Sequence, residues 1–477
     1  MKKTLIRSSF SYGFIQYLIL GMGFVKGIYQ AKHLGPELLG TYGLIALFIE
    51  YMRYANLGTL SGMNLEASIR HGNAEKEAHV RLIVDTVFTY ITMLSAIFFL
   101  SALSIRLFFP SLMAEDIRGY LFAIALFGTV GQFKTFASYY SRLHERYQWM
   151  NRLELTSSLI LFTGVMALVA RFKLNAIVGS MVASSIVTLG LSLWIVAPHV
   201  RPKINWEILK GLILVGFPIL LFTLSEKIFT SIDRLTIVNY LPREDMGYFT
   251  LANTVLSSTM VLLSAFTVVS SPKVLKKFNL KNREGDGTKA IFNDLKKYTS
   301  ILSALSIGLG LTGIILMEPF VKFLLPKYSP SIPLYQILTM GMMFDNTTHF
   351  ASSYLVSNKH QFLLMGLVGL IAVFTLSGNF LAIQLGWGLK GVAAVTCISM
   401  ISYGLGKLYM VLKKLGHFRV ENLVDLFKRY FIILLVLVPL LTWAPSHLYL
   451  ALPVFVTLYF NEIKDLLTRF RTGLVSR

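Results

Sequence analysis

Long apolar segments separated by short polar ones make up most of the sequence. Twelve of these segments have about the 20 residues with which a helix crosses a bilayer. They lie near 10–31, 38–62, 82–105, 118–141, 153–170, 174–197, 211–239, 246–270, 298–320, 332–356, 362–384 and 391–411. Two further segments, 430–444 and 447–461, are shorter and cross only if they tilt or if their flanks snorkel. We therefore predict an all-α polytopic membrane protein with about 14 transmembrane helices.

The composition agrees with this pattern. Of the 477 residues, 55% are apolar and only 14% are charged, whereas globular proteins have roughly 45–50% and about 25%. A soluble enzyme of this length would need polar surfaces that such a composition does not supply. The one cysteine, Cys397, excludes an internal disulfide and any metal or redox site built from several cysteines.

Basic residues are distributed unevenly between alternate loops. The formal net charge is +21, from 45 Lys and Arg against 24 Asp and Glu. With the N-terminus inside, the cytoplasmic segments hold 30 basic residues, the opposite loops hold 9 and the predicted helices hold 6. This bias is the positive-inside signal, so we predict a multi-pass plasma-membrane protein with both termini cytoplasmic. Because topology explains most of the positive charge, we expect no nucleic-acid partner.

An internal repeat relates the two halves of the chain. Residues 33–44 align without gaps on residues 240–251, an offset of 207, and leucine, glutamate, glycine and leucine coincide. Six predicted helices separate the copies, so both enter the membrane in the same direction. We predict two six-helix lobes, 1–200 and 207–412, related by a pseudo-two-fold axis along the membrane normal, with helices one and seven facing each other across a cleft. Residues 428–477 then add two short C-terminal helices and a cytoplasmic tail.

Two short motifs lie within or just before the repeated segments. They are Leu34-Gly35-Pro36-Glu37 with Gly40 and Tyr42, and Ser231-Ile232-Asp233-Arg234 followed by Leu241 and Gly247. In these motifs, and in length and helix number, the chain resembles the O-antigen-type polysaccharide flippases of the multidrug/oligosaccharidyl-lipid/polysaccharide exporter superfamily. The resemblance implies a V-shaped bundle of two lobes in the bacterial inner membrane. It also implies a monomer that moves a polyprenyl-diphosphate-linked oligosaccharide from the cytoplasmic to the outer leaflet, with that substrate and membrane lipid as its partners.

Basic residues inside predicted helices are candidate contacts for an anionic substrate, because a charge at bilayer depth faces protein or water. We expect Lys227, Arg234, Arg53 and Lys26 to give the cavity a positive potential and to contact the diphosphate. Arginine suits phosphate through its bidentate fork, and lysine acts as a mobile point charge. Two alternatives stay open: Lys26 lies near a helix end, where it could snorkel, and Arg53 lies three residues from Glu50, with which it could pair.

The predicted seventh helix carries four charges. Glu226 and Asp233 are seven residues apart, as are Lys227 and Arg234, so each pair shares a face of the helix, and the two stripes lie about 100° apart. Such a helix cannot face lipid. It either lines the cavity, which we favour, or is a structural helix held by ion pairs.

Four carboxylates are candidates for coupling transport to a proton or a sodium ion: Glu50, Glu226, Asp233 and Asp345. Asp345 and His349 are four residues apart, and a histidine beside a carboxylate can act as a proton site. An ordinary hydrogen bond between the two is the favoured alternative.

The sequence contains no convincing motif for nucleotide binding, metal binding or catalysis. Residues 308–313 match the dinucleotide fingerprint but lie inside an apolar helix, and the sequence has neither a Walker A loop nor metal-ligand spacing. We therefore expect no cofactor, no metal and no enzymatic activity. A cation-coupled multidrug exporter remains the second hypothesis because Glu50 supplies an acidic group in the first lobe. A membrane-bound glycosyltransferase or O-antigen polymerase ranks last, since it would need catalytic groups on a long outer loop.

Overall fold

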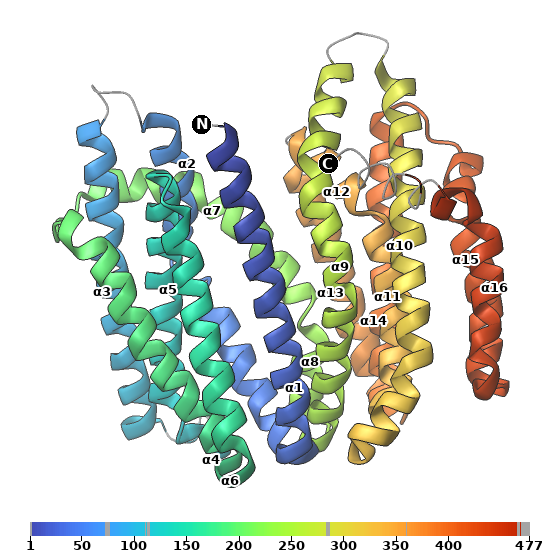
Figure 1. Cartoon of the computed structure of the whole chain (residues 1–477), viewed down its shortest axis with the longest axis horizontal. Coiled ribbons are helices and arrows are strands. Elements are labelled where there is room, and N and C mark those ends of the chain that lie inside the picture. Colours follow the sequence, from blue (N-terminus) through green and yellow to red (C-terminus); the bar gives the residue numbers. More distant parts are fainter. Residues whose placement is uncertain are drawn as a thin grey trace. The chain divides into compact units, whose positions relative to one another are not determined.

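The computed structural model describes residues 2–71, 77–109, 111, 115–282, 287–358, 360–464 and 468. Every regular element in these ranges is helical, and seven of the helices are long and apolar enough to cross a membrane (Figure 1). The all-α polytopic prediction is therefore confirmed. The basic residues Lys76, Arg283 and Lys359, and most of the tail predicted after 464, lie outside the described residues.

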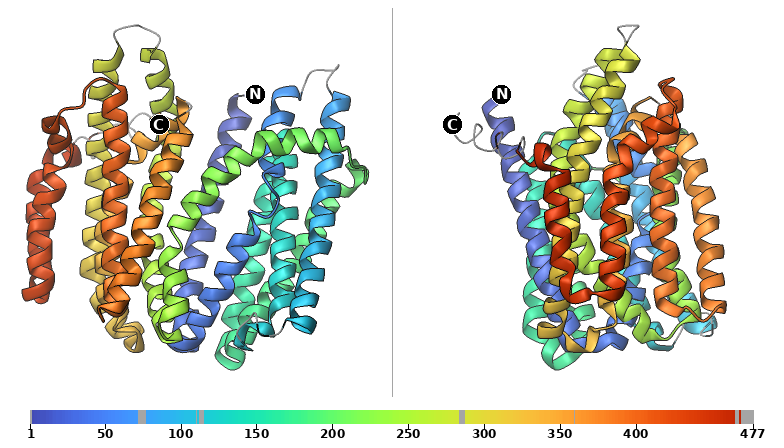
Figure 2. Two further views of the ribbon diagram at one scale, coloured as in Figure 1. Left: turned by 180° about the vertical axis from the view of Figure 1, so that it is seen from behind. Right: turned by 90° about the vertical axis from the view of Figure 1, so that its right-hand side faces the viewer.

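The chain divides into two compact units. Unit 1 comprises Met1–Lys227 and Pro242–Thr250, and unit 2 comprises Ile228–Leu241 and Leu251–Arg477. The first seven helices are α1 (Lys2–Met52), α2 (Thr59–Arg70), α3 (Glu77–Phe108), α4 (Glu115–Arg118), α5 (Leu121–Leu143), α6 (Tyr147–Val196) and α7 (Trp206–Phe229). Within unit 1, α5 packs against α3 and α6, and α1 packs against α6 (Figure 2).

The remaining helices build unit 2, apart from the first turns of α9. They are α8 (Ile232–Tyr240), α9 (Arg243–Asn282), α10 (Gly287–Leu324), α11 (Ser331–Thr347), α12 (His349–Ser357), α13 (Gln361–Gln384), α14 (Gly388–Lys414), α15 (Val420–Trp443) and α16 (Ala451–Leu458). Short 3-10 turns occupy Ala197–His199, Pro326–Tyr328 and Pro445–Leu450. Within unit 2, α14 packs against α11 and α13, α10 packs against α11, and α15 contacts both α10 and α16.

Each of the fourteen apolar segments falls on a described helix, but some neighbours are joined. Segments 10–31 and 38–62 meet in α1 across a kink at Gly35, whose φ of 76° and ψ of 170° are open to glycine at little cost. Pro36 follows directly and reinforces the bend. In α6 the joint is Lys173, with φ 49° and ψ −125°.

Three segments that were predicted as continuous helices are interrupted, which corrects the sequence-based boundaries. The breaks lie at Arg53–Gly58, at Thr230–Ser231 and at Thr348. In the first break, the Asn56 side chain accepts from the Gly58 N–H at 3.0 Å and donates to the Arg53 carbonyl at 2.8 Å. A hydropathy pattern does not reveal such breaks. The residues around them are still mostly apolar, and a side chain makes the hydrogen bonds that the helix backbone would have made.

The helix at 430–444 is longer than predicted. The structure has 24 residues in α15, which begins at Val420, because the charged stretch before the apolar run is also helical. The segment predicted at 447–461 begins as a 3-10 turn and continues as α16, which has 8 residues.

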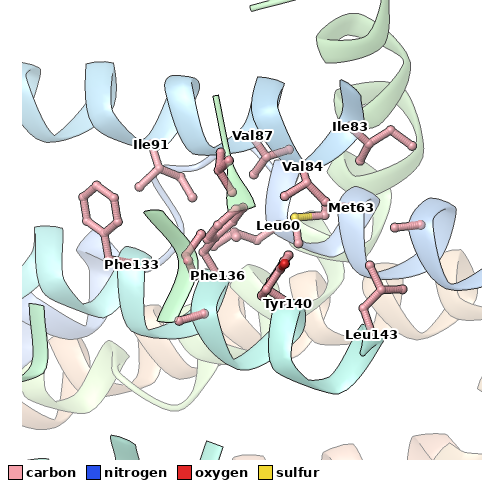
Figure 3. Packing of buried hydrophobic residues seen from close by; sticks show 14 of the residues in the cluster. Leu60, Met63, Ile83, Val84, Val87, Ile91, Phe133, Phe136, Tyr140 and Leu143 are labelled. Carbon is pink, nitrogen blue, oxygen red and sulfur yellow. The ribbon is translucent and has the colours of Figure 1, made fainter. Parts of the chain in front are cut away.

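An apolar core holds α2, α3 and α5 together in unit 1. Figure 3 shows side chains from the three helices meeting in one cluster: Leu60, Met63, Ile83, Val84, Val87, Ile91, Phe133, Phe136, Tyr140 and Leu143. Phe136 is only 1% exposed, so its truncation to alanine would cost about 3–5 kcal/mol through lost burial and the cavity left behind.

The repeated segments touch each other inside unit 1. A Cβ on Gly40 would collide with the carbonyl oxygen of Arg243, and a Cβ on Gly247 would collide with that of Pro36. Positions 36 and 243, like 40 and 247, are related by the offset of 207. The two contacts are therefore equivalent, as a local two-fold relation requires. The prediction of whole lobes related by an axis along the membrane normal stays a prediction.

Candidate substrate cavity in unit 1

Two adjoining cavities open within unit 1. The first has a volume of about 550 Å³ and is lined by α1, α5 and α6. The second has a volume of about 410 Å³ and lies between the break that follows α1, the middle of α5 and the last turns of α7. Glu50, Arg53, Gly131 and Thr135 line both. We refer to the two together as the unit 1 cavity.

The break after α1 places Arg53 at this shared wall. The helix ends at Met52, and Gln132 on α5 donates to the Met52 carbonyl at 2.8 Å. Asn56 in turn donates to the Gln132 side chain at 3.0 Å. These bonds fix the turn that carries Arg53, and a cation at the C-terminal end of a helix is favoured by the helix dipole.

Both carboxylates of the unit 1 cavity are paired with lysine. Glu50 pairs with Lys227 from α7, and the Glu154 carboxylate lies 2.8 Å from the Nζ of Lys134. The alternative in which Arg53 pairs with Glu50 is therefore not what the structure adopts. Each pair is nearly neutral, so it adds little to the net potential of the cavity.

Three further cations make the unit 1 cavity positive. Lys26, Arg53 and Arg142 line it, and none of them has an ion pair with a carboxylate in the described ranges. Arg142 instead lies over the Tyr139 ring, 5.5 Å from its centroid. The arrangement can hold an anion of two or more charges, because three cations in a partly enclosed space attract it with little competition.

Hydroxyl groups on α6 line the opposite wall. Ser184 donates to the Ser157 carbonyl at 2.9 Å, and Ser185 and Thr188 also border the first cavity. The hydroxyls of Ser185 and Thr188 have no hydrogen-bond partner among the residues that the structure describes. Such groups can exchange hydrogen bonds with sugar hydroxyls after small rotamer changes.

Four of the residues predicted for the site come together here: Lys26, Glu50, Arg53 and Lys227. Sequence reasoning missed the contributions of Lys134, Arg142 and Glu154. By hydropathy, Arg142 lies just after the predicted segment 118–141, and Lys134 lies within two turns or so of the end of that segment, where a lysine can snorkel. The Lys134–Glu154 pair depends on the packing of α5 on α6, which no local signal in the sequence reveals.

Asp233 and Arg234 lie elsewhere. They belong to α8 in unit 2, whereas Glu226 and Lys227 end α7 in unit 1. The expectation that each i, i+7 pair shares one helical face is wrong, because Thr230 and Ser231 interrupt the helix. Asp233 is 5% exposed and accepts from the Arg234 backbone N–H at 2.7 Å.

Asp345 takes part in an ion pair inside unit 2. Its carboxylate lies 2.6 Å from the Nζ of Lys407, which is 3% exposed and stands over the Tyr403 ring at 4.3 Å. Lys407 is therefore buried inside unit 2 beside its carboxylate partner. His349 follows the break at Thr348, and its Nε2 lies 3.3 Å from the Ser271 hydroxyl. Within the described residues, no cluster of His, Cys, Asp and Glu has the geometry of a metal site.

Comparisons with known proteins agree with this architecture. A family model described as "Polysaccharide biosynthesis protein" matches residues 5–278. A search of curated proteins gives no match. Among solved structures, the lipid II flippase MurJ in an inward closed conformation has a TM-score of 0.71 at 14% identity, covering 98% of this chain and 100% of that one.

Two further solved structures have the same fold. An inward-facing multidrug resistance MATE family transporter of the MOP superfamily gives a TM-score of 0.67 at 16% identity, covering 83% of this chain and 94% of that one. A MOP superfamily transporter from Pyrococcus furiosus Vc1, described as having a binding pocket of reverse polarity, gives 0.57 at 13% identity, covering 87% and 96%. At these identities the likeness concerns the fold.

Proposed function

The chain belongs to the polysaccharide biosynthesis protein family, and from this premise we propose that it flips a polyprenyl-diphosphate-linked oligosaccharide from the cytoplasmic to the outer leaflet of a bacterial inner membrane. The fold is that of MOP-superfamily transporters, which supports transport by alternating access instead of enzymatic chemistry. The observation that carries the proposal is the excess of cations in the unit 1 cavity: Lys26, Arg53 and Arg142 stand beside two neutralised carboxylates.

The diphosphate is the part of the substrate that such a cavity recognises. Arg53 offers a planar fork that binds phosphate oxygens in pairs, and Lys26 offers a point charge on a flexible stem. Lys227 supports the site through its pair with Glu50, and it becomes a third phosphate contact if that pair opens. Arg234, in unit 2, is proposed as a further contact during transport.

The sugar also needs a polar path. Each hydroxyl or amide that entered hydrocarbon without a partner would cost several kcal/mol. The serine and threonine hydroxyls of α6 supply partners along the wall of the unit 1 cavity. The polyprenyl tail needs no such path and can stay in the lipid.

The membrane potential supplies a driving force. A diphosphate diester carries about two negative charges, and moving each outward gains roughly 2.3 kcal/mol per 100 mV when the inside is negative. This gain requires that the cations of the cavity stay with the protein and do not cross the full field with the substrate. A rocking-lobe mechanism keeps the site near the midplane and so limits the cancellation. Resetting the empty carrier is then the difficult step, which a proton or sodium ion bound at Glu50, Glu226, Asp233 or Asp345 would assist.

A cation-coupled multidrug exporter is the second candidate, favoured by the presence of Glu50 in the cavity. Against it stands the pairing of Glu50 with Lys227, which leaves a cationic drug facing a net positive wall. The full chain in proteoliposomes distinguishes the two functions. We expect flipping of a fluorescent undecaprenyl-diphosphate oligosaccharide and no movement of ethidium. Movement of ethidium without the lipid-linked sugar would overturn the proposal.

A further inference from the structure

A third polar cavity lies in unit 2, apart from the residues proposed for the substrate. It has a volume of about 310 Å³ and is bordered by the first half of α10, the first turns of α15 and the residues that follow α16. Its charged lining consists of Lys296, Lys297, Lys428 and Arg429 against Asp425 and Glu462. The lining thus has two positive charges in excess.

The acidic groups hold the cations in place. Asp425 lies 2.9 Å from the Nζ of Lys296 and 2.8 Å from that of Lys428, so it joins α10 to α15. Hydrogen bonds from Lys428 and Lys296 lower the pKa of the Asp425 carboxyl to about 2, which keeps it charged at any physiological pH. Lys297 has no ion pair among the described residues and is free to meet a ligand.

Arg429 is fixed from three sides. Its Nη1 donates to Glu462 at 2.5 Å and to the Ser300 hydroxyl at 3.2 Å, and its guanidinium stands 5.3 Å from the centroid of the Tyr459 ring. Tyr459 is itself held by a 2.5 Å hydrogen bond with Ser303. A guanidinium held in this way keeps its remaining N–H groups ready for an anion at little entropic cost.

The cavity also contains an acceptor without a donor. The Oε2 of Glu462 is buried and has no hydrogen-bond partner among the residues described. A ligand that suits this cavity therefore combines an anionic group with a hydrogen-bond donor a few atoms away.

The position of the cavity along its helices indicates where such a ligand comes from. The apolar run of α15 starts directly after Arg429 and that of α10 starts at Ile301, so the cavity lies where polar sequence gives way to membrane-spanning sequence. Beyond it, α15 exposes apolar side chains, among them Ile432 at 40% and Leu435 at 75%. Acyl chains can lie along these residues while a head group occupies the cavity.

We propose that this cavity binds the head group of an anionic glycerophospholipid, of the chemistry of phosphatidylglycerol. The phosphodiester contacts Lys297, Lys428 and Arg429, and a glycerol hydroxyl donates to Glu462. The bound lipid links α10, α15 and the segment after α16 to one leaflet at a fixed depth.

Native mass spectrometry of the full chain, taken from vesicles of equal phosphatidylglycerol and phosphatidylcholine, tests this. Wild type should retain phosphatidylglycerol in preference to phosphatidylcholine. Lys297→Gln should weaken its binding by about fivefold, since a basic residue near a membrane surface contributes about 1 kcal/mol. Arg429→Gln should weaken it more. Lys289→Gln is the matched control, because Lys289 lies on α10 but outside the cavity.

Lys297 is exposed and has no ion pair within the described part of the chain, so its substitution leaves the fold intact even if Arg429→Gln does not fold. Equal retention of phosphatidylglycerol by wild type, Lys297→Gln and Lys289→Gln would overturn the proposal. Displacement of the lipid by millimolar inorganic phosphate would also overturn it, because the site would then bind free phosphate and not a lipid head group.

Discussion

Gly40 and Gly247 make equivalent contacts between the two repeated segments. Gly40 leaves room for the backbone carbonyl of Arg243, and Gly247 leaves room for the backbone carbonyl of Pro36. Gly43 faces Thr250, its own partner in the repeat. An approximate two-fold axis therefore passes between residues 36–43 and 243–250. Glycine is required at positions 40 and 247 because the neighbouring atoms there are backbone atoms and cannot rotate away.

Gly40→Ala and Gly247→Ala should each destabilise the protein by about 1–3 kcal/mol, the usual cost of overpacking. The thermal unfolding midpoint of the purified full chain measures this. Gly179→Ala is the control, because nothing lies within 4 Å of a Cβ at that position. If all three variants unfold at the wild-type temperature, the close contact between the repeats is not part of the fold.

The Glu50–Lys227 pair yields a second prediction. Glu50→Gln and Lys227→Gln each remove one member of the ion pair and shift the cavity charge by one unit, so each should lose stability and transport. The double variant removes both charges and should regain much of what the singles lose, with a coupling energy of about 0.5–3 kcal/mol. Its net cavity charge equals that of wild type, so flipping should survive. A double variant that folds well but does not transport would instead assign the substrate contact to this pair.

A histidine outside the membrane-spanning segments makes stability depend on pH. His144 follows α5, and burial, together with the nearby His71 and Arg146 side chains, lowers its pKa below the usual 6.5. The unfolded chain then binds a proton at His144 more readily than the folded chain. The contribution of neutral His144 to the free energy of unfolding is therefore fully present above pH 6.5 and is lost as the pH falls below it. Melting curves between pH 7.5 and 5.5 should shift less for His144→Gln than for wild type. His447→Gln, on an exposed turn of unit 2, should behave as wild type.

The membrane potential should set the rate of net outward flipping. In proteoliposomes, collapsing the potential with valinomycin and potassium, while the pH gradient is held at zero, should slow the reaction because two charges move outward. The same vesicles with a potential of reversed sign should reverse the preferred direction. An unchanged rate would exclude the potential as the driving force.

Helix positions were predictable from the sequence because they depend on local apolar runs, and all fourteen segments lie on helices. The breaks were not predictable from local sequence. Near Arg53, the side chains of Asn56 and Gln132 make hydrogen bonds to the backbone and to each other, although the two residues are 76 positions apart in the chain. The break at Thr230 and Ser231 places Lys227 and Arg234 on different helices, whereas the hydropathy pattern predicts one continuous helix that contains both.

For the site, sequence indicated the charge but not the pairing. Lys26, Arg53 and Lys227 stood out because charges are rare in membrane helices. Which carboxylate neutralises which lysine depends on contacts such as Asp345 with Lys407, 62 residues apart. Only the three-dimensional arrangement distinguishes the cations left for a substrate from those already paired.

The cations of the unit 1 cavity that have no ion pair among the described residues should bind the diphosphate, and flipping by charge-neutralised variants measures their contribution. Full-length wild type, Arg53→Gln and Lys26→Gln are compared with Arg171→Gln, a control arginine on the exposed surface of α6. Each is reconstituted at equal density, and flipping of fluorescent undecaprenyl-diphosphate oligosaccharide is followed. Arg53→Gln should slow flipping at low substrate concentration by about tenfold or more, because a charge-assisted hydrogen bond contributes about 1.5–3 kcal/mol, while Arg171→Gln flips as wild type. Wild-type rates in both Arg53→Gln and Lys26→Gln would mean that these cations do not bind the diphosphate.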